Sequence, residues 1–276
     1  MQTVPRVSVV MAAYNAERYI DEAVESVLKQ TYTDFELLVV DDHSTDGMAA
    51  KLAIYAERDS RVRILRNQKN KGQLGSLNRG ILEARGEFVA IMDADDICLN
   101  TRIQAQVEYL EAHPEIGVVG CLTDAFVDDP AITRPSGARA DASWLDGVIV
   151  MAHPTMMVRR ELYAEHGLYD QHPRFETVGD HELQSRFASR GVKMAVIDEI
   201  LLHYRVHPEN MTKSRRREQV GAVLYLNLRI LFTYRRLLSR RGWRSFLRHF
   251  AIWSYLTLKL ETLIPRSLGK RLLPAK

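Results

Sequence analysis

The sequence predicts an α/β fold in which a mainly parallel sheet is flanked by helices. Over the first 122 residues, short apolar runs alternate with stretches of helical periodicity. Because parallel strands need crossover connections, this alternation indicates a sheet covered by helices on both faces. The 276 residues are 46% hydrophobic and 26% charged, which is typical of a globular protein and excludes disordered and fibrous classes.

The first apolar run, residues 7–12, is rich in Val and predicts a buried strand. Residues 16–30 follow with apolar side chains at helical spacing, and Asn15 is placed to cap that helix. The second strand is expected at 35–40, where it ends in a polar cluster. The alternation then continues with a helix at 48–58, a strand at 62–66, a helix at 73–84, a strand at 87–92, a helix near 100–112 and an apolar run at 117–121.

The second part of the chain is less regular. Residues 123–150 contain Asp, Pro, Gly and Ser and predict loops. After them we expect helices at 160–166 and 180–190, β-like runs at 193–197 and 201–206, and helical segments at 215–239 and 243–263.

Charge is divided unevenly between two segments. Residues 1–210 carry 22 basic and 33 acidic side chains, whereas residues 211–276 carry 16 basic and two acidic ones, so the net charge of +3 is a sum of unlike parts. Uncharged windows in the second segment reach only about ten residues, too short to span a bilayer. A basic amphipathic helical tail with Trp243 and Trp253 suits the interface of an anionic membrane. The alternative is a helical hairpin packed on the domain or on a second subunit of a homo-oligomer; no nucleic-acid-binding module accompanies the charge.

Two features bear on the compartment. Cys98 and Cys121 are too few for a disulfide framework, which favours a reducing environment. The first residues lack the pattern of a secretory signal peptide, so a cytoplasmic protein is expected, at the inner face of the cell membrane if the tail binds lipid.

Polar residues that directly follow predicted strands are the first candidates for a site, because ligands of such sheets bind at the carboxyl ends of the strands. Tyr14 could stack on a flat ring, although Ala13-Tyr14-Asn15 could equally be a turn that begins a helix. Asp41 and Asp42 could accept hydrogen bonds from a base or ribose. Ser44 and Asp46 are interpreted as capping residues only.

The Asp93-Ala94-Asp95-Asp96 cluster follows the strand at 87–92. Three carboxylates within four residues repel one another unless a cation lies between them. Oxygen ligands of this kind suit Mn²⁺ or Mg²⁺, with the phosphate oxygens of a donor completing the shell. We therefore expect a divalent metal at this cluster, with helix capping as the alternative.

The sequence resembles the family-2 inverting glycosyltransferases of GT-A fold. The resemblance is carried by short motifs whose order and spacing are specific, and it covers roughly residues 5–210. The motifs are residues 7–20, 26–31 and 35–47, Asn70-Lys71-Gly72, Leu77-Asn78-Arg79-Gly80, Ala84-Arg85-Gly86-Glu87 and the Asp93–Asp96 cluster. It implies a GT-A domain at 1–210, with a nucleotide-binding half at 1–122 and an acceptor half at 123–210, followed by the tail at 211–276.

The resemblance also implies roles for residues of the donor half. Tyr14 and Asp42 would contact a nucleotide base, usually uracil, with Ala13 and Asp41 nearby. Asp95 and Asp96 would hold the metal on the diphosphate, with Asp93 beside the donor. The remaining donor-side expectations are Gly72 and Asn78 along the groove, Arg205 at the phosphates, and His207 as a further metal ligand.

The acceptor half departs from the family pattern. Members often carry Glu-Asp before a Leu and an Arg, whereas this chain has Gly179-Asp180. Asp180 keeps the position of the catalytic base, and Glu182 is the second candidate, on another helical face. His153 resembles a residue beside the acceptor pocket, with Glu182 as the other expected acceptor contact.

The expected activity is metal-dependent transfer of a sugar from a nucleotide-diphospho-sugar, a UDP-sugar in the first place, to a hydroxyl of a lipid-linked or cell-surface polysaccharide precursor. Two other classes share single features. A nucleotidyltransferase shares the fold and metal but usually has a Gly-rich basic loop where this chain has Tyr14-Asn15-Ala16-Glu17. A receiver-like signalling domain needs a Lys after a later strand, and none occurs between Lys71 and Lys193.

Overall fold

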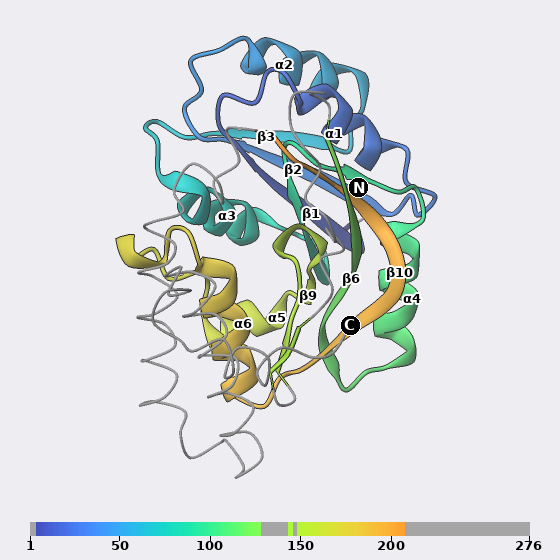
Figure 1. Cartoon of the computed structure of the whole chain (residues 1–276). Coiled ribbons are helices and arrows are strands. Elements are labelled where there is room, and N and C mark those ends of the chain that lie inside the picture. Colours follow the sequence, from blue (N-terminus) through green and yellow to red (C-terminus); the bar gives the residue numbers. More distant parts are fainter. Residues whose placement is uncertain (1–3, 128–142, 146–147, 208–276) are drawn as a thin grey trace, which may run out of the picture.

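The structure is a computed structural model and describes residues 4–127, 143–145 and 148–207 (Figure 1). The predicted basic tail at 211–276 and most of the predicted loop region at 123–150 therefore lie outside the described residues. No helix within the described ranges is long and apolar enough to cross a membrane.

An eight-stranded sheet forms the centre of the domain, with the strand order β3-β2-β1-β4-β9-β6-β10-β5. Its strands are β1 (Val7–Ala13), β2 (Phe35–Asp41), β3 (Val62–Arg66), β4 (Phe88–Asp93), β5 (Ile97–Cys98), β6 (Ile116–Phe126), β9 (Met157–Arg159) and β10 (Lys193–Arg205). All run parallel except β9 and β5, which are antiparallel to their neighbours. A separate hairpin pairs β7 (Ser143–Leu145) with β8 (Val148–Val150). The predicted mainly parallel α/β fold is thus confirmed.

The helices connect the strands and cover both faces of the sheet, as Figure 1 shows. They are α1 (Ile20–Leu28), α2 (Met48–Arg58), α3 (Gly72–Glu83), α4 (Arg102–Ala112), α5 (Glu161–His166) and α6 (Gly179–Ser189), with 3₁₀ turns η1 (His153–Thr155) and η2 (Pro173–Phe175). Alternate residues of β1 explain the two layers, because successive side chains of a strand point to opposite faces. Val9 packs in the core with α1, α2 and α4, whereas Val10 packs in the core with α3, α5 and α6.

Three local expectations are corrected. Helix α1 begins at Ile20 rather than at residue 16, since Asn15 takes a positive φ of 49° and its side chain bonds a neighbouring loop instead of capping the helix. The runs at 193–197 and 201–206 form one strand, β10, whose pairing with β6 shifts register between Ile197 and Leu202. The three-residue strand β9 was not expected at all, and it joins β4 to β6.

Candidate active site

A cleft of about 860 Å³ opens where the parallel strands end. Residues of β1, β4, β6 and β10 line it, together with the N-termini of α3 and α6. Nine of the residues singled out in the sequence line it: Ala13, Tyr14, Asp42, Gly72, Asp93, Asp95, His153, Asp180 and His207. Their roles toward ligands stay predictions, but the fold brings them together around one space.

One end of the cleft is shaped by two interlocked loops, which follow β1 and β2. The Asn15 amide N–H donates to Ser44 Oγ (3.0 Å), and the Thr45 amide donates to Asn15 Oδ1 (2.9 Å). The Glu17 carboxylate links the same two loops again, because it accepts a hydrogen bond from the Gly47 amide at 2.8 Å. These reciprocal bonds fix the backbone beside Tyr14, whose side chain is 52% exposed at the cleft.

Asp42 lies deeper, between this end and α3. Its Oδ1 atom accepts from Asn67 Nδ2 (2.7 Å) and from the Lys71 amide (2.8 Å), while Oδ2 accepts no hydrogen bond from the described residues. Lys71 leads directly into Gly72, where φ is +75° and where a Cβ would lie 2.4 Å from Glu176 Oε1. The positive φ favours glycine at position 72, and a side chain there would have to displace the Glu176 carboxylate.

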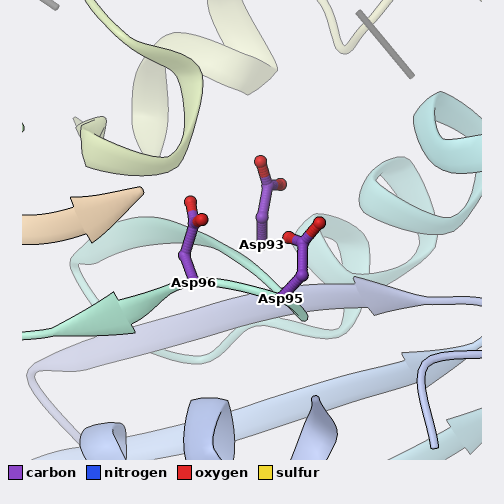
Figure 2. A group of neighbouring side chains, drawn as sticks. All are labelled: Asp93, Asp95 and Asp96. Atoms are coloured by element: carbon purple, nitrogen blue, oxygen red, sulfur yellow. The ribbon is translucent and has the colours of Figure 1, made fainter. Parts of the chain in front are cut away.

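The acidic cluster lies at the end of β4, and Figure 2 shows its three side chains projecting to the same side. One carboxylate oxygen each of Asp93, Asp95 and Asp96 lies within 4.8 Å of the others. Asp95 Oδ2 is 2.8 Å from His207 Nε2. Asp96 is fully buried: Oδ1 accepts from the Arg205 amide at 2.9 Å, but Oδ2 has no partner among the described residues.

Burial makes ionisation of Asp93 and Asp96 costly. Burial, together with the negative charges of Asp95 and Asp180, raises the pKa of Asp93 to about 6 against the opposing effect of His153. Burial and the neighbouring aspartates also raise the pKa of Asp96 well above its ordinary value. A carboxylate trio with a buried oxygen left unbonded fits a hard divalent cation, which would take that oxygen and offset the repulsion.

The cleft as a whole is acidic. Five carboxylates line it, those of Asp42, Asp93, Asp95, Glu176 and Asp180, whereas no Lys or Arg does so in the described part of the chain. An anionic ligand in this space would be repelled unless a cation came with it.

Asp180 and His153 also line the cleft. Asp180 lies in the first turn of α6, where the helix N-terminus stabilises a negative side chain, and its Oδ2 is 4.0 Å from His181 Nε2. His153 on η1 is hydrogen-bonded through Nε2 to the Tyr169 hydroxyl (2.9 Å), and its Nδ1 is 4.0 Å from Asp93 Oδ1.

Two donor-side expectations are corrected because the side chains are committed elsewhere. Asp41 does not line the cleft; its Oδ1 accepts from the Ser44 amide at 2.8 Å, and its Oδ2 is 3.4 Å from Arg66 Nε. Asn78 is buried behind the cleft, where its amide group bonds both the carbonyl and the N–H of Tyr169, at 2.8 and 2.9 Å. Both residues shape loops of the site without facing its space.

Arg205 and Glu182 are corrected in the same way. The guanidinium of Arg205 is buried outside the cleft, with Nε donating to the Asp95 carbonyl (2.7 Å) and Nη2 donating to Glu22 (2.5 Å). It therefore holds the turn that carries the acidic cluster. Glu182 is paired with Arg186 at 3.0 Å, with only 4% of its side chain exposed, and it does not line the cleft.

Three cleft features were missed from the sequence. Gln73 donates from Nε2 to Asp93 Oδ1 at 3.3 Å, and its position directly after Gly72 was the available signal. Glu176 accepts from the Gln73 amide at 3.2 Å, and Tyr169 orients His153. Glu176 and Tyr169 come from an irregular segment about 100 residues away from α3, so no local pattern marked them.

The chain is similar in sequence to known glycosyltransferases. Residues 8–167 match the family described as glycosyl transferase family 2. The putative glycosyltransferase EpsE of Bacillus subtilis is 34% identical over 222 residues, which are 78% of each chain. Over 104 residues, 38% of this chain and 40% of the relative, identity reaches 40% with WfgD of Escherichia coli, a UDP-Glc:alpha-D-GlcNAc-diphosphoundecaprenol beta-1,3-glucosyltransferase.

A solved structure supports the fold independently. The mannosyltransferase PcManGT from Pyrobaculum calidifontis, in complex with GDP-Man and Mn²⁺, superimposes with a TM-score of 0.71. The match covers 93% of this chain and 72% of that one at 20% identity, a level at which fold alone is shared.

Proposed function

The chain belongs to glycosyl transferase family 2, and on that premise we propose that it is an inverting, metal-dependent enzyme using a nucleotide-diphospho-sugar. Family membership removes the nucleotidyltransferase and the receiver-like domain as alternatives. The donor proposed is a UDP-sugar, and the acceptor is a hydroxyl of a lipid-linked or polysaccharide precursor.

The observation that carries the proposal is the charge of the cleft. A nucleoside diphosphate is anionic, yet five carboxylates and no Lys or Arg line this space in the described ranges. Asp95 and Asp96, with Asp93 and His207 beside them, would hold Mn²⁺ or Mg²⁺. When bound, the ion would offset the charge that develops on the leaving diphosphate. The Mn²⁺ in the PcManGT complex supports this assignment.

Asp180 is the proposed general base. It would take the proton of the acceptor hydroxyl as that oxygen bonds to the anomeric carbon, while the bond between this carbon and the diphosphate breaks with its electron pair leaving on the diphosphate oxygen. Attack from the side opposite the leaving group inverts the anomeric configuration. Asp180 suits this role because it lines the cleft and is close enough to Asp93 for the two charges to interact.

The base-binding end of the donor is assigned to Tyr14 and Asp42. Tyr14 offers an exposed ring at the cleft, and Asp42 offers a carboxylate oxygen with no protein donor among the described residues. Uracil is preferred because the relative WfgD is named for UDP-Glc, although the structural neighbour PcManGT binds GDP-Man. Gly72 and His153 complete the proposed substrate contacts, toward the donor and the acceptor respectively.

A lipid-linked acceptor would place the enzyme at the cytoplasmic face of the membrane. WfgD is named for a diphosphoundecaprenol-linked acceptor, and the tail at 211–276 has 16 basic and two acidic side chains. The test is flotation of full-length protein with anionic liposomes, comparing the wild type with a variant carrying Arg215→Glu, Arg216→Glu and Arg217→Glu. Equal flotation of the two proteins would contradict binding through the tail.

Donor and base are tested separately. Thermal unfolding with Mn²⁺ across common UDP- and GDP-sugars should show one sugar nucleotide that stabilises more than its free nucleoside diphosphate. Asp180→Asn should then abolish transfer and leave UDP affinity within about twofold, because the base acts only in the chemical step. Its control is Glu182→Gln on the same helix, which should transfer sugar when folded. Substantial turnover by Asp180→Asn would reject Asp180 as the base.

A further inference from the structure

Arg102 is a buried cation for which neither the fold nor the proposed mechanism accounts. Its side chain is only 2% exposed. The guanidinium donates to the Ile91 carbonyl (2.8 Å) and to Gln106 Oε1 (3.1 Å), with Met92 Sδ at 3.4 Å. None of these partners is charged, and no carboxylate of the described residues forms an ion pair with it.

Such a placement is costly on two grounds. A buried charge without an adjacent counter-charge loses several kcal/mol of hydration. Arg102 is also the first residue of α4, where the helix dipole disfavours a positive side chain. A neutral side chain could fill the same volume, so some other interaction must favour the charge.

That interaction is with the acidic cluster. Ile91 and Met92, which the guanidinium contacts, immediately precede Asp93 on β4. The positive charge of Arg102 acts on Asp93 and Asp96, where it favours the ionised carboxylates. Its direction is fixed by Gln106, whose amide donates to the Thr155 carbonyl (2.7 Å) and the Val119 carbonyl (3.3 Å).

We propose that Arg102 is the built-in counter-ion of the Asp93 and Asp96 carboxylates, stabilising them in the metal-free cleft and weakening the hold of the acidic cluster on its metal. The inference rests on the proposed metal-dependent function. Arg102 is a positioning residue, because it acts through the aspartates and does not line the cleft. Its charge keeps the metal exchangeable, since a fixed cation repels a divalent ion at the neighbouring site.

The direction in which Mn²⁺ affinity changes when Arg102 is replaced separates this role from a structural one. We would titrate the full-length protein with Mn²⁺ alone and count the free ion by electron paramagnetic resonance at about pH 8, where protons compete less for carboxylates. Arg102→Met should bind Mn²⁺ about tenfold more tightly than the wild type, because a like charge beside the ion has been removed. If Arg102 served packing alone, its loss would leave Mn²⁺ affinity unchanged or weaken it, and either result would overturn the proposal.

Arg159 provides the matched control. It is another largely buried arginine that bonds backbone carbonyls, those of Ile116 (2.9 Å) and Leu110 (2.7 Å), and it pairs with Phe88 at the opposite end of β4 from Asp93. Arg159→Met should lower the melting temperature and leave Mn²⁺ affinity as in the wild type. Arg102→Lys, which keeps the charge, should also bind Mn²⁺ within about twofold of the wild type.

Melting temperatures provide the test for variants that fold poorly. Metal-free Arg102→Met should melt at a lower temperature than the wild type. Mn²⁺ should raise the melting temperature of this variant by more than it raises that of the wild type. The same results are expected for Arg102→Gln, which retains a donor for the Ile91 carbonyl. Variants that fold only with Mn²⁺ support the proposal, whereas variants that Mn²⁺ does not rescue overturn it. If the wild type itself bound no Mn²⁺, the proposed metal dependence would fail first; if it binds and Arg102→Met is no tighter, only the role of Arg102 fails.

Discussion

Asp93 gives a stability prediction whose sign can be worked out from the structure. Burial and neighbouring negative charges raise its pKa from an ordinary 3.8 to about 6, so without metal the ionised form destabilises the fold. This cost is absent below the ordinary pKa, grows as the pH rises from 3.8 to 6, and is constant above that range. The difference corresponds to at most about 3 kcal/mol, since Asp93 retains 21% of its side-chain exposure.

Asp93→Asn tests this cost, because the amide resembles the neutral acid. Metal-free Asp93→Asn should be more stable than the wild type by up to about 3 kcal/mol above pH 7, and the gap should close towards pH 4. The assay is urea unfolding with a chelator across that range. In Mn²⁺ the order should reverse, because the wild type alone keeps the full set of proposed ligands.

Asp59→Asn is the control of opposite sign. Asp59 has a similar exposure, 22%, but hydrogen bonds from Arg61 lower its pKa, so its ionised form stabilises the fold. Asp59→Asn should therefore be less stable than the wild type by a constant amount above the ordinary value of 3.8, and the gap should close only below it, as the pH falls through the lowered pKa. The reasoning would be refuted if metal-free Asp93→Asn were no more stable than the wild type above pH 7.

Three other substitutions address corrected or packed positions. Asn78→Ala should lose about 2 kcal/mol of stability with UDP affinity retained, because it removes two buried hydrogen bonds to Tyr169 but no cleft contact; calorimetry showing lost UDP binding in a folded variant would restore a donor role. Glu182→Gln should cost about 3 kcal/mol in chemical unfolding by leaving Arg186 without its carboxylate, and turnover below the melting temperature should persist. Gly86→Ala should cost about 3 kcal/mol, since a Cβ there would lie 2.6 Å from the Ser8 backbone nitrogen; an unchanged melting temperature would contradict that contact.

Much of the fold could be predicted because its strands are uninterrupted apolar runs. Helix α2 and strand β3 have the predicted bounds, β1 ends one residue later than predicted, and β4 is shifted by one residue at both ends. The errors arise where tertiary contacts decide. Asp198 and Glu199 look like a break between strands, yet β10 continues through them because the register with β6 shifts at that point. Strand β9 is too short for any periodicity and exists only because β4 and β6 lie on either side of it.

The site was predictable in outline for a similar reason. Parallel strands end at one edge of the sheet, so polar residues after β1 and β4 had to meet there. Sequence could not separate Asp41 from Asp42, because adjacent residues point to opposite sides and only the surrounding loops decide which faces the cleft. Nor could it show that Arg102 is buried, since the first residue of a helix is usually hydrated.

The central claim is that a divalent metal held by the acidic cluster binds the donor diphosphate, and calorimetry of UDP binding tests it most directly, with GDP in parallel. The wild type should bind the nucleotide with Mn²⁺ and lose that binding in a chelator, and folded Asp95→Ala should bind it in neither condition. Equal nucleotide affinity of wild type and Asp95→Ala in Mn²⁺, or full wild-type binding in the chelator, would contradict the account.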